Sequence, residues 1–259
     1  MATNKKTKPK RPYRQLKARR NKIIIFSLVG AAVLIEGIIL LVQFFGPKDG
    51  VSSFEMGKAS DFVTNTNMTE GDAAAEHHFV EYTDLFCPYC AKFALAVQDN
   101  QAAFEAEYLQ PKKIYFELRI TDLLSNSVEN PVNSHNAALT AYCTAEQGKF
   151  WDFYRAFLTQ IKTEFYDQGI GNAHGAPHIP DQALEYFTSI AQQSGSDLNQ
   201  LNECLSSDRP AVQLANANAM AAQETTGGLP YFIFGDYKTS GFNSDWETVK
   251  QMFAAGGAK

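Results

Sequence analysis

The sequence predicts an α/β fold in which two groups of strands flank a long block of helices, with one transmembrane helix at the N-terminus. Three patterns support this prediction. A strand, a helix and a second strand follow one another between residues 78 and 120, helical periodicity dominates residues 134–226, and two short strands and a helix come after residue 230. The apolar fraction of 45% is typical of a globular protein that can fill a substantial core.

The first 22 residues form a basic tail. They hold ten of the 23 Lys and Arg residues and no acidic residue, which leaves 13 basic against 28 acidic residues in the rest of the chain. An acidic body would repel nucleic acid, so we expect no nucleic-acid binding there. The tail lies immediately before an apolar stretch, which indicates the cytoplasmic flank of a membrane helix.

Residues 23–46 are predicted to be a transmembrane anchor. Ile23–Phe45 contains one charge, Glu36, and at about 1.5 Å per residue a helix of this length crosses a hydrocarbon core of about 30 Å. The stretch is longer than the roughly 7–15 apolar residues of a cleaved signal peptide, and it ends in Phe-Phe-Gly-Pro-Lys rather than at a small-residue cleavage site. The basic flank places the N-terminus in the cytoplasm and residues 48–259 outside it.

Residues 47–75 are expected to form a flexible linker, because they are rich in Gly, Ser, Thr, Asn and Asp and lack sustained apolar periodicity. An ordered domain, 76–259, follows. Its first strand, His78–Thr83, ends at Asp84, which is expected to be a loop residue. Pro88 suits the first turn of a helix, because its missing N–H has no intrahelical partner there, and this helix should run to about residue 107.

An alternating strand follows, with Ile114, Phe116, Leu118 and Ile120 on one face. The remaining elements are predicted from periodicity and capping residues. They are helices at about 134–147 and 150–161, an irregular loop at 164–180, helices capped by Asp181 and by Asp197, a helix opened by Pro210, strands at 231–234 and near 237–242, and a helix that begins at Asp245.

The motif Cys87-Pro88-Tyr89-Cys90 lies at the start of the first predicted helix. Two sulfurs at this spacing can form a disulfide or separate as thiols with little backbone change. The unpaired N–H groups and the dipole at a helix start favour negative charge, so the pKa of Cys87 should fall. Cys87 would then form the mixed disulfide and Cys90 would resolve it, while Pro88 and Tyr89 set how strongly the thiolate is stabilised.

Two other interpretations of this motif are weaker. A structural zinc site needs four ligands, but Cys143 and Cys204 stand alone and the His residues complete no spacing pattern, so we predict no metal. A fixed structural disulfide between Cys87 and Cys90 would close a very small loop and add little stability. Redox chemistry therefore explains the motif best.

Three separated segments resemble one family. The segment from Glu81 to Cys90 resembles the active-site segment of DsbA-like thioredoxin-fold thiol–disulfide oxidoreductases, residues 135–139 and 147–153 resemble the helical insertion of that family, and residues 227–235 resemble its second active-site loop. The resemblance covers roughly residues 77–255. It implies an α/β thioredoxin fold with an inserted helical domain at about 130–226.

The resemblance also implies roles for three further residues. Pro230 would be a cis-proline beside the redox pair, and the backbone of Leu229, where the family often has Val or Thr, could pair with a client peptide as an added strand. Glu81 would be a buried carboxylate near Cys90. Such a group has a raised pKa and could pass a proton to or from Cys90.

Cys143 and Cys204 also lie beyond the predicted anchor, on two helices of the helical block. We expect a structural disulfide between them, which would close a long loop and stabilise the fold by roughly 4 kcal/mol. The alternative is two buried free cysteines that pack as small apolar residues.

The sequence and the resemblance together predict a bacterial, single-pass membrane protein with a monomeric extracytoplasmic domain that introduces disulfides into exported proteins. Clients with free thiols and a quinone-linked membrane reoxidant are the partners that the resemblance implies. No redox cofactor is expected, because the cysteine pair carries the electrons. A reductase or isomerase with the same site, and a redox-inactive module that binds clients, remain as alternatives.

Overall fold

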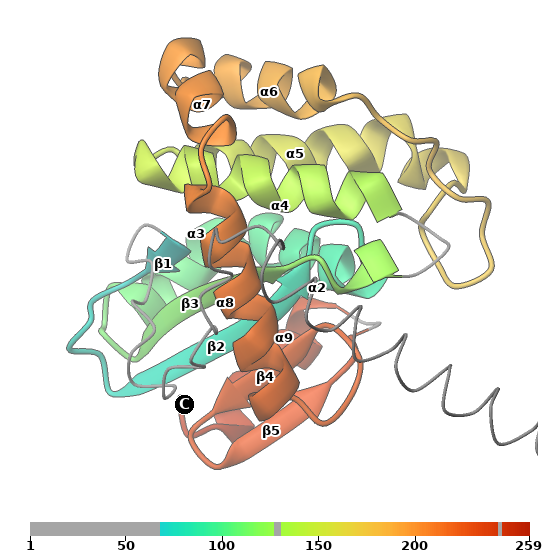
Figure 1. Cartoon of the computed structure of the whole chain (residues 1–259). Helices are drawn as coiled ribbons and strands as arrows, with labels where there is room; N and C mark the ends of the chain where they lie inside the picture. The colour runs from blue at the N-terminus through green and yellow to red at the C-terminus, as the bar shows by residue number, and fades with distance from the viewer. Residues whose placement is uncertain (1–67, 127–130, 243–244) are drawn as a thin grey trace, which may run out of the picture. The chain divides into compact units, whose positions relative to one another are not determined.

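The computed structural model describes residues 68–126, 131–242 and 245–259 (Figure 1). The predicted basic tail, the anchor at 23–46 and most of the predicted linker lie outside these ranges. Within them, no helix combines the length and the apolar character needed to cross a membrane.

The described part contains a five-stranded sheet with the order β1-β3-β2-β4-β5. β2 and β3 are parallel, and the other neighbouring pairs are antiparallel. The strands are β1 Thr69–Glu70, β2 His77–Asp84, β3 Ile114–Thr121, β4 Tyr231–Phe234 and β5 Tyr237–Ser240. The predicted strands are therefore confirmed, and β2, the strand that leads to Cys87, lies at the centre of the sheet.

β1 corrects the predicted extent of the linker. Residues 68–75 were expected to be flexible, but Met68 is buried and β1 pairs with β3 along the edge of the sheet. The indole N–H of Trp151 donates to the Thr69 carbonyl at 3.0 Å. A strand of two residues is too short to show a periodic pattern, so it could not be predicted from local residues.

The connection from β2 to β3 is three short helical segments rather than the single helix that was predicted. They are α2 Pro88–Gln98, α3 Gln101–Phe104 and the π-helical turn η3 Glu105–Leu109. The break falls at Asn100, whose side-chain amide donates to the Ala96 carbonyl at 2.9 Å. Asn side chains that bond to nearby backbone compete with the helix in this way.

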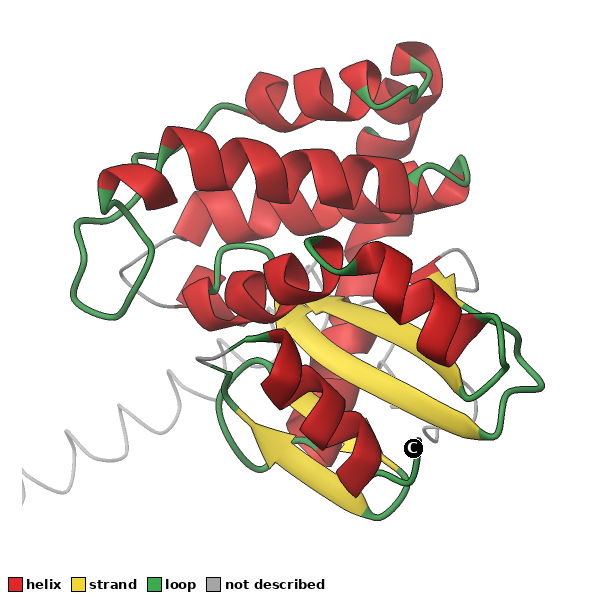
Figure 2. Ribbon diagram, turned by 180° about the vertical axis from the view of Figure 1, so that it is seen from behind, coloured by secondary structure: helices red, strands yellow, loops and turns green. Residues whose placement is uncertain are grey.

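Phe79 lies at the centre of the core under the sheet. Its ring is 5.0–6.1 Å from those of five other phenylalanines, namely Phe93, Phe116, Phe232, Phe234 and Phe253. Phe93 comes from α2 and Phe253 from α9 (Trp246–Ala255), and these two helices lie against one face of the sheet (Figure 2). As predicted, α9 is capped by Asp245, which accepts from the Thr248 N–H at 3.1 Å.

α8 (Arg209–Glu224) crosses the opposite face of the sheet (Figure 1). Its last residue, Glu224, is held by two strands, because the Tyr82 hydroxyl donates to Glu224 Oε2 at 2.6 Å and Arg119 Nη1 donates to the same oxygen at 2.9 Å. These bonds fix the point from which the chain turns into the segment 225–230. The sheet therefore positions both parts of the predicted site: β2 leads into Cys87, and the bonds to Glu224 hold the start of the segment that contains Pro230.

The helical block is inserted between β3 and β4. Besides α8 it contains α4 Pro131–Glu146, α5 Phe150–Glu164, α6 Leu184–Gln193, α7 Leu198–Leu205 and the 3-10 turns η4 Leu123–Asn126 and η5 Tyr166–Gln168. The predicted cap of α7 is confirmed, since Asp197 Oδ1 accepts from the Gln200 N–H at 2.9 Å.

The predicted cap of α6 by Asp181 is wrong. The residue at the cap position is Ala183, and its side chain makes no cap hydrogen bond. The chain before α6 is fixed instead by Asn133 of α4, whose side chain accepts from Gln182 N at 2.7 Å and donates to the Pro180 carbonyl at 3.0 Å. A contact across nearly fifty residues has no local sequence signal.

Candidate functional site

Cys87 and Cys90 lie where β2 gives way to α2. Cys87 is the N-cap residue of α2, Pro88 occupies the first turn as predicted, and Cys90 follows on the buried side of the helix. The Cys87 N–H donates to the Asp84 carbonyl at 3.0 Å, and the Cys87 carbonyl accepts from Ala91 N at 3.0 Å. Both thiols are free and buried. The two sulfurs are therefore held together by the start of one helix.

The two thiols differ in their acidity. The pKa of Cys87 is lowered, chiefly by the hydrogen bond from the Cys90 thiol and further by the backbone N–H groups of Cys90 and Tyr89, although burial and the Asp84 carboxylate oppose this. The pKa of Cys90 is raised well above that of an ordinary thiol by burial, by Cys87 and by Glu81. Negative charge therefore collects on Cys87, while Cys90 keeps its proton.

The second loop of the site comes from the segment before β4. The Leu229–Pro230 peptide bond is cis, as the resemblance implied. The Leu229 carbonyl oxygen accepts from Cys87 Sγ at 3.7 Å, and the Pro230 carbonyl accepts from Gly241 N at 2.8 Å. The structure thus brings Leu229 against the thiol of a residue 142 positions earlier in the chain.

Glu81 lies on the central strand, between Leu118 of β3 and Phe232 of β4. Its side chain is fully buried, and among the described residues neither carboxylate oxygen has a hydrogen-bond partner of good geometry. Burial raises the pKa of Glu81 well above that of an ordinary glutamate, and the nearby Thr83 hydroxyl offsets only part of this rise. Glu81 is therefore a buried acid beside Cys90, as the resemblance implied.

Asp84 was expected to be a loop residue, but it is the last residue of β2 and is fully buried. Its carboxylate accepts from Phe86 N at 2.9 Å, from Leu124 N at 3.0 Å and from the Ser134 hydroxyl at 2.6 Å. Burial raises its pKa to about 6 despite these donors. Asp84 thus joins the loop before Cys87 to η4 and to α4 of the insertion. Two of its partners are 40 or more residues away, so the sequence could not identify this role.

Two tyrosines of the insertion also face the site. The pKa of Tyr166 is raised by burial and by nearby charge on Cys87 and Cys90, and among the described residues its buried hydroxyl has no hydrogen-bond partner. The pKa of Tyr154, on α5, is raised by burial and by Glu81 and Cys90. Both tyrosines would pass for ordinary core aromatics in the sequence.

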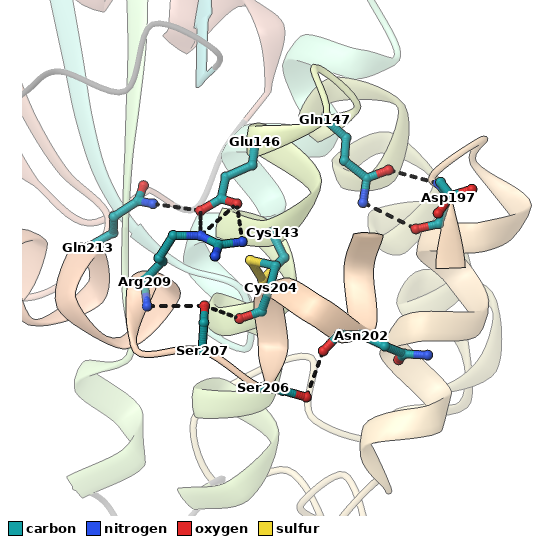
Figure 3. Close-up of polar contacts among 10 residues, drawn as sticks. All are labelled: Cys143, Glu146, Gln147, Asp197, Asn202, Cys204, Ser206, Ser207, Arg209 and Gln213. Carbon is teal, nitrogen blue, oxygen red and sulfur yellow. Dashed lines mark hydrogen bonds and ion pairs between the residues drawn. A yellow bond between two sulfur atoms is a disulfide. The ribbon is translucent and has the colours of Figure 1, made fainter. Parts of the chain in front are cut away.

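Cys143 of α4 and Cys204 of α7 are bonded, with an S–S distance of 2.03 Å and their Cα atoms 5.7 Å apart. The predicted structural disulfide is thus present. Figure 3 shows polar contacts around it: Arg209 binds the Glu146 carboxylate at 3.1 Å, and Gln147 Oε1 accepts from Asp197 N at 2.7 Å. Among the described residues, no group of three or more His, Cys, Asp or Glu is placed to hold a metal ion.

The model of a protein family described as Thioredoxin matches residues 63–253. A curated protein of Rickettsia typhi, provisionally named a protein-disulfide oxidoreductase, is 24% identical over 184 residues. The match covers 71% of this chain and 60% of that relative, so the chain spans less than two thirds of the relative's length.

Several solved structures share the fold. BdbD from Bacillus subtilis has a TM-score of 0.53 and 17% identity, and the match covers 73% of this chain and 91% of BdbD. The thiol-disulfide exchange protein α-DsbA2 from Wolbachia pipientis has a TM-score of 0.52 and 18% identity, with 77% and 98% covered. The catalytic domain of Proteus mirabilis ScsC has a TM-score of 0.53 and 16% identity, with 78% and 94% covered. At such identities, these matches establish the thioredoxin-like fold with its helical insertion.

Proposed function

Because the chain belongs to the Thioredoxin family, whose model matches residues 63–253, we propose that it is a thiol–disulfide oxidoreductase of the DsbA or ScsC type that works through Cys87 and Cys90. One observation carries this proposal. The pKa of Cys87 is lowered and that of Cys90 is raised, beside a cis Leu229–Pro230 bond. A stabilised thiolate with a protonated partner is what disulfide exchange requires.

The direction that we propose is oxidation of client proteins. A client thiolate attacks Cys87 Sγ, the Cys87–Cys90 bond breaks, and Cys90 leaves as a thiolate that takes up a proton. A second client thiolate then attacks the client sulfur of the mixed disulfide, and Cys87 leaves as a thiolate. The client has lost two electrons and gained a disulfide, and the cysteine pair has taken up those electrons. The lowered pKa of Cys87 makes it a good leaving group in the second step.

The neighbouring residues have separate roles in this scheme. Glu81 supplies the proton to Cys90, because it is a buried acid next to that thiol. Tyr89 helps through its backbone N–H, which stabilises the Cys87 thiolate, and Pro88 fixes the start of the helix. The extended backbone at Leu229 pairs with the client, with its carbonyl already directed at Cys87.

The proposed setting follows from the N-terminal sequence. A basic tail and an anchor at 23–46 would hold the domain on the outer side of a bacterial cell membrane, where exported proteins with free thiols are the clients. The reduced pair must be reoxidised after each cycle, so we propose a membrane reoxidant as a second partner. The pair itself carries the electrons, and the scheme uses no redox cofactor.

One observation favours the opposite direction, in which the protein reduces or rearranges disulfides. The Asp84 carboxylate opposes charge on Cys87 and so raises its pKa. A less stable thiolate makes the disulfide form harder to reduce and lowers the reduction potential. Oxidation remains the leading proposal because the groups that stabilise the Cys87 thiolate outweigh Asp84.

The full-length protein in detergent, equilibrated in glutathione buffers, tests the proposal. Alkylation of Cys87 gives the reduced fraction and hence the reduction potential. We expect a value well above the roughly −270 mV of thioredoxin, together with oxidation of a reduced, unfolded client protein. A potential close to that of thioredoxin with an ordinary Cys87 pKa would overturn the oxidase proposal. Activity that survives in a Cys87→Ser variant would instead indicate a redox-inactive binding module.

A further inference from the structure

One row of side chains lies across the face of the sheet that α8 crosses (Figure 1). In the strand register, Arg119 of β3 is opposite Tyr82 of β2, and Tyr82 is opposite Tyr231 of β4. Residues directly opposite one another in neighbouring strands share one face of a sheet, so these three side chains are neighbours. Both tyrosines are buried, and the Arg119 guanidinium lies over the Tyr82 ring, 5.2 Å from its centroid. We call these three residues the support row.

The support row holds Glu224, the last residue of α8. The Tyr82 hydroxyl and Arg119 Nη1 both donate to Glu224 Oε2, at 2.6 and 2.9 Å. Burial and the Glu224 carboxylate raise the pKa of Tyr82, although Arg119 opposes this, so the hydroxyl keeps its proton and stays a donor. Arg119 is fixed in turn by the buried Glu117, which accepts from Arg119 Nε at 2.6 Å. Two donors that the sheet itself holds in place thus bind Glu224.

A carboxylate at this end of a helix needs such a partner. The helix dipole places partial negative charge at the C-terminus, which disfavours an acid there. The last turn of α8 reads Ala-Ala-Gln-Glu and contains no basic residue. Arg119 supplies the cation from β3 instead. The position of the last turn of α8, and of the segment that leaves it, therefore depends on the sheet.

The support row also contacts the segment 225–230, which leads from α8 to β4. The Thr226 hydroxyl lies 3.2 Å from the Tyr231 hydroxyl. Leu229 packs against the small apolar cluster to which both tyrosines of the row belong. The Leu229 carbonyl then lies 3.7 Å from Cys87 Sγ. The row therefore holds this segment at its start, near its middle and at the residue that meets the reactive thiol.

We propose that Arg119, Tyr82 and Glu224 are positioning residues for client binding. They hold the segment 225–230 so that the backbone of Leu229 is placed to pair with a client peptide. The inference rests on the proposed function and adds a source of selectivity to it. A client with a peptide backbone uses this segment, whereas a small thiol without one does not. The three residues therefore set how strongly the protein prefers peptide thiols to small thiols.

Glu224→Ala is the first test, because Arg119 stays bonded to Glu117 and Tyr82 and no buried charge is left unpaired. In full-length oxidised protein, the active-site disulfide is reduced either by a synthetic peptide with two cysteines or by dithiothreitol, which has no peptide backbone. The ratio of the peptide rate to the dithiothreitol rate should fall about tenfold, through a higher half-saturating peptide concentration. A general structural fault would slow both reactions and leave the ratio unchanged.

Glu146→Ala is the matched control. Glu146 ends α4 as Glu224 ends α8, their side chains are 29% and 28% exposed, and each binds an arginine of another element. The partner of Glu146 is Arg209 (Figure 3), which begins α8 at the opposite end from the segment 225–230. The ratio of this control should equal that of wild type.

Two conservative variants refine the test. Glu224→Gln keeps a side-chain oxygen that can accept from both donors, so it should recover most of the wild-type ratio. Tyr231→Phe removes only the hydroxyl that meets Thr226, and it should lower the ratio by about threefold, the effect of one hydrogen bond between neutral groups.

The outcomes separate the two proposals. An unchanged ratio in Glu224→Ala, or an equal fall in Glu146→Ala, overturns the positioning role. A Glu224→Gln variant as impaired as Glu224→Ala also overturns it, because charge rather than position would then carry the effect. If Glu224→Ala does not fold, Tyr231→Phe decides in its place. A wild-type protein that exchanges no disulfide with either reductant overturns the proposed function itself.

Discussion

Both cysteine pairs are buried, but they differ in whether their sulfurs are bonded and in the groups around them. Cys87 and Cys90 are 6% and 2% exposed and stay as thiols, whereas Cys143 and Cys204 are 0% and 1% exposed and are bonded. Burial therefore does not decide which pair is reactive. The first pair begins a helix and has the buried carboxyl groups of Asp84 and Glu81 beside it. The second joins two helices, and the polar contacts near it, Arg209–Glu146 and Asp197–Gln147, are exposed. The neighbouring charges and the backbone decide the chemistry.

The largest expected effect separates the pairs by activity. Cys87→Ser should abolish oxidation of a reduced client protein, because Cys90, the other free thiol among the described residues, is more deeply buried and keeps its proton. The double variant Cys143→Ala, Cys204→Ala should keep the wild-type rate at a temperature where it is folded. Client disulfide formation, followed by alkylation and gel shift, measures both. The comparison fails if the bonded pair also proves necessary for exchange.

The second effect separates the pairs by stability. Removing the Cys143–Cys204 bond should lower the free energy of unfolding by roughly 4 kcal/mol, because the bond closes a long loop in the unfolded chain. Its sequence separation is 61 residues. Removing the Cys87–Cys90 pair should have a much smaller effect, since that loop is short. Urea unfolding of both double variants gives the two values, and similar losses would contradict the comparison.

The third effect concerns the buried charge of Asp84. Its pKa is raised to about 6 in the folded protein, against about 3.9 in an unfolded chain. Because the folded value is the higher one, the contribution of Asp84 to stability is fully present below pH 4 and is lost as the pH rises to 6. The loss corresponds to roughly 3 kcal/mol.

Urea unfolding of wild type and Asp84→Asn at pH 4 and pH 7 measures this contribution. Stability relative to the variant should be higher at pH 4 than at pH 7. Glu146→Gln, at an exposed site near the bonded pair, should show no comparable change. The same Asp84→Asn variant should lower the pKa of Cys87, since Asp84 opposes charge on that thiol. An unchanged Cys87 pKa would show that Asp84 does not act on that thiol.

The smallest effect concerns Glu81. Glu81→Gln should slow exchange in both directions by about a hundredfold, the lower end of what general acid–base catalysis contributes. Charge on Cys87 raises the pKa of Glu81, so the replacement should in turn lower the pKa of Cys87, which alkylation of Cys87 against pH measures. Stopped-flow kinetics with glutathione measures the rates. A variant as fast as wild type would show that Cys90 obtains its proton elsewhere.

Periodic patterns predicted most of the fold. The long strands, the aromatic face of α5 and the caps Asp197 and Asp245 each follow from residues close together in the chain. The features that the sequence could not predict depend on distant contacts: the edge strand at Thr69 pairs with β3, and the loop before α6 is held by Asn133.

The site shows the same division. Cys87 and Cys90 were predicted from a local motif, and the cis bond at Pro230 and the burial of Glu81 were implied by the family resemblance. Asp84 and Tyr166 were not identified, because a buried carboxylate and a buried hydroxyl differ from surface ones only through partners that the fold supplies. The small cavity that Glu81 lines likewise forms only where strands β1, β2 and β3 meet helices α2, α3 and α5.

The contact between Cys87 and the Leu229 carbonyl also determines when the site is completed during synthesis. Translation delivers the two cysteines of the motif 142 residues before the loop that covers them. At about 5–20 residues per second, this leaves a delay of roughly 7–28 s. Cys143 emerges within that interval, while its partner Cys204 is still missing. For part of synthesis, the Cys87 and Cys143 thiols are therefore both present while their final neighbours are still missing. This order of segments allows the two thiols to form a wrong disulfide in the growing chain.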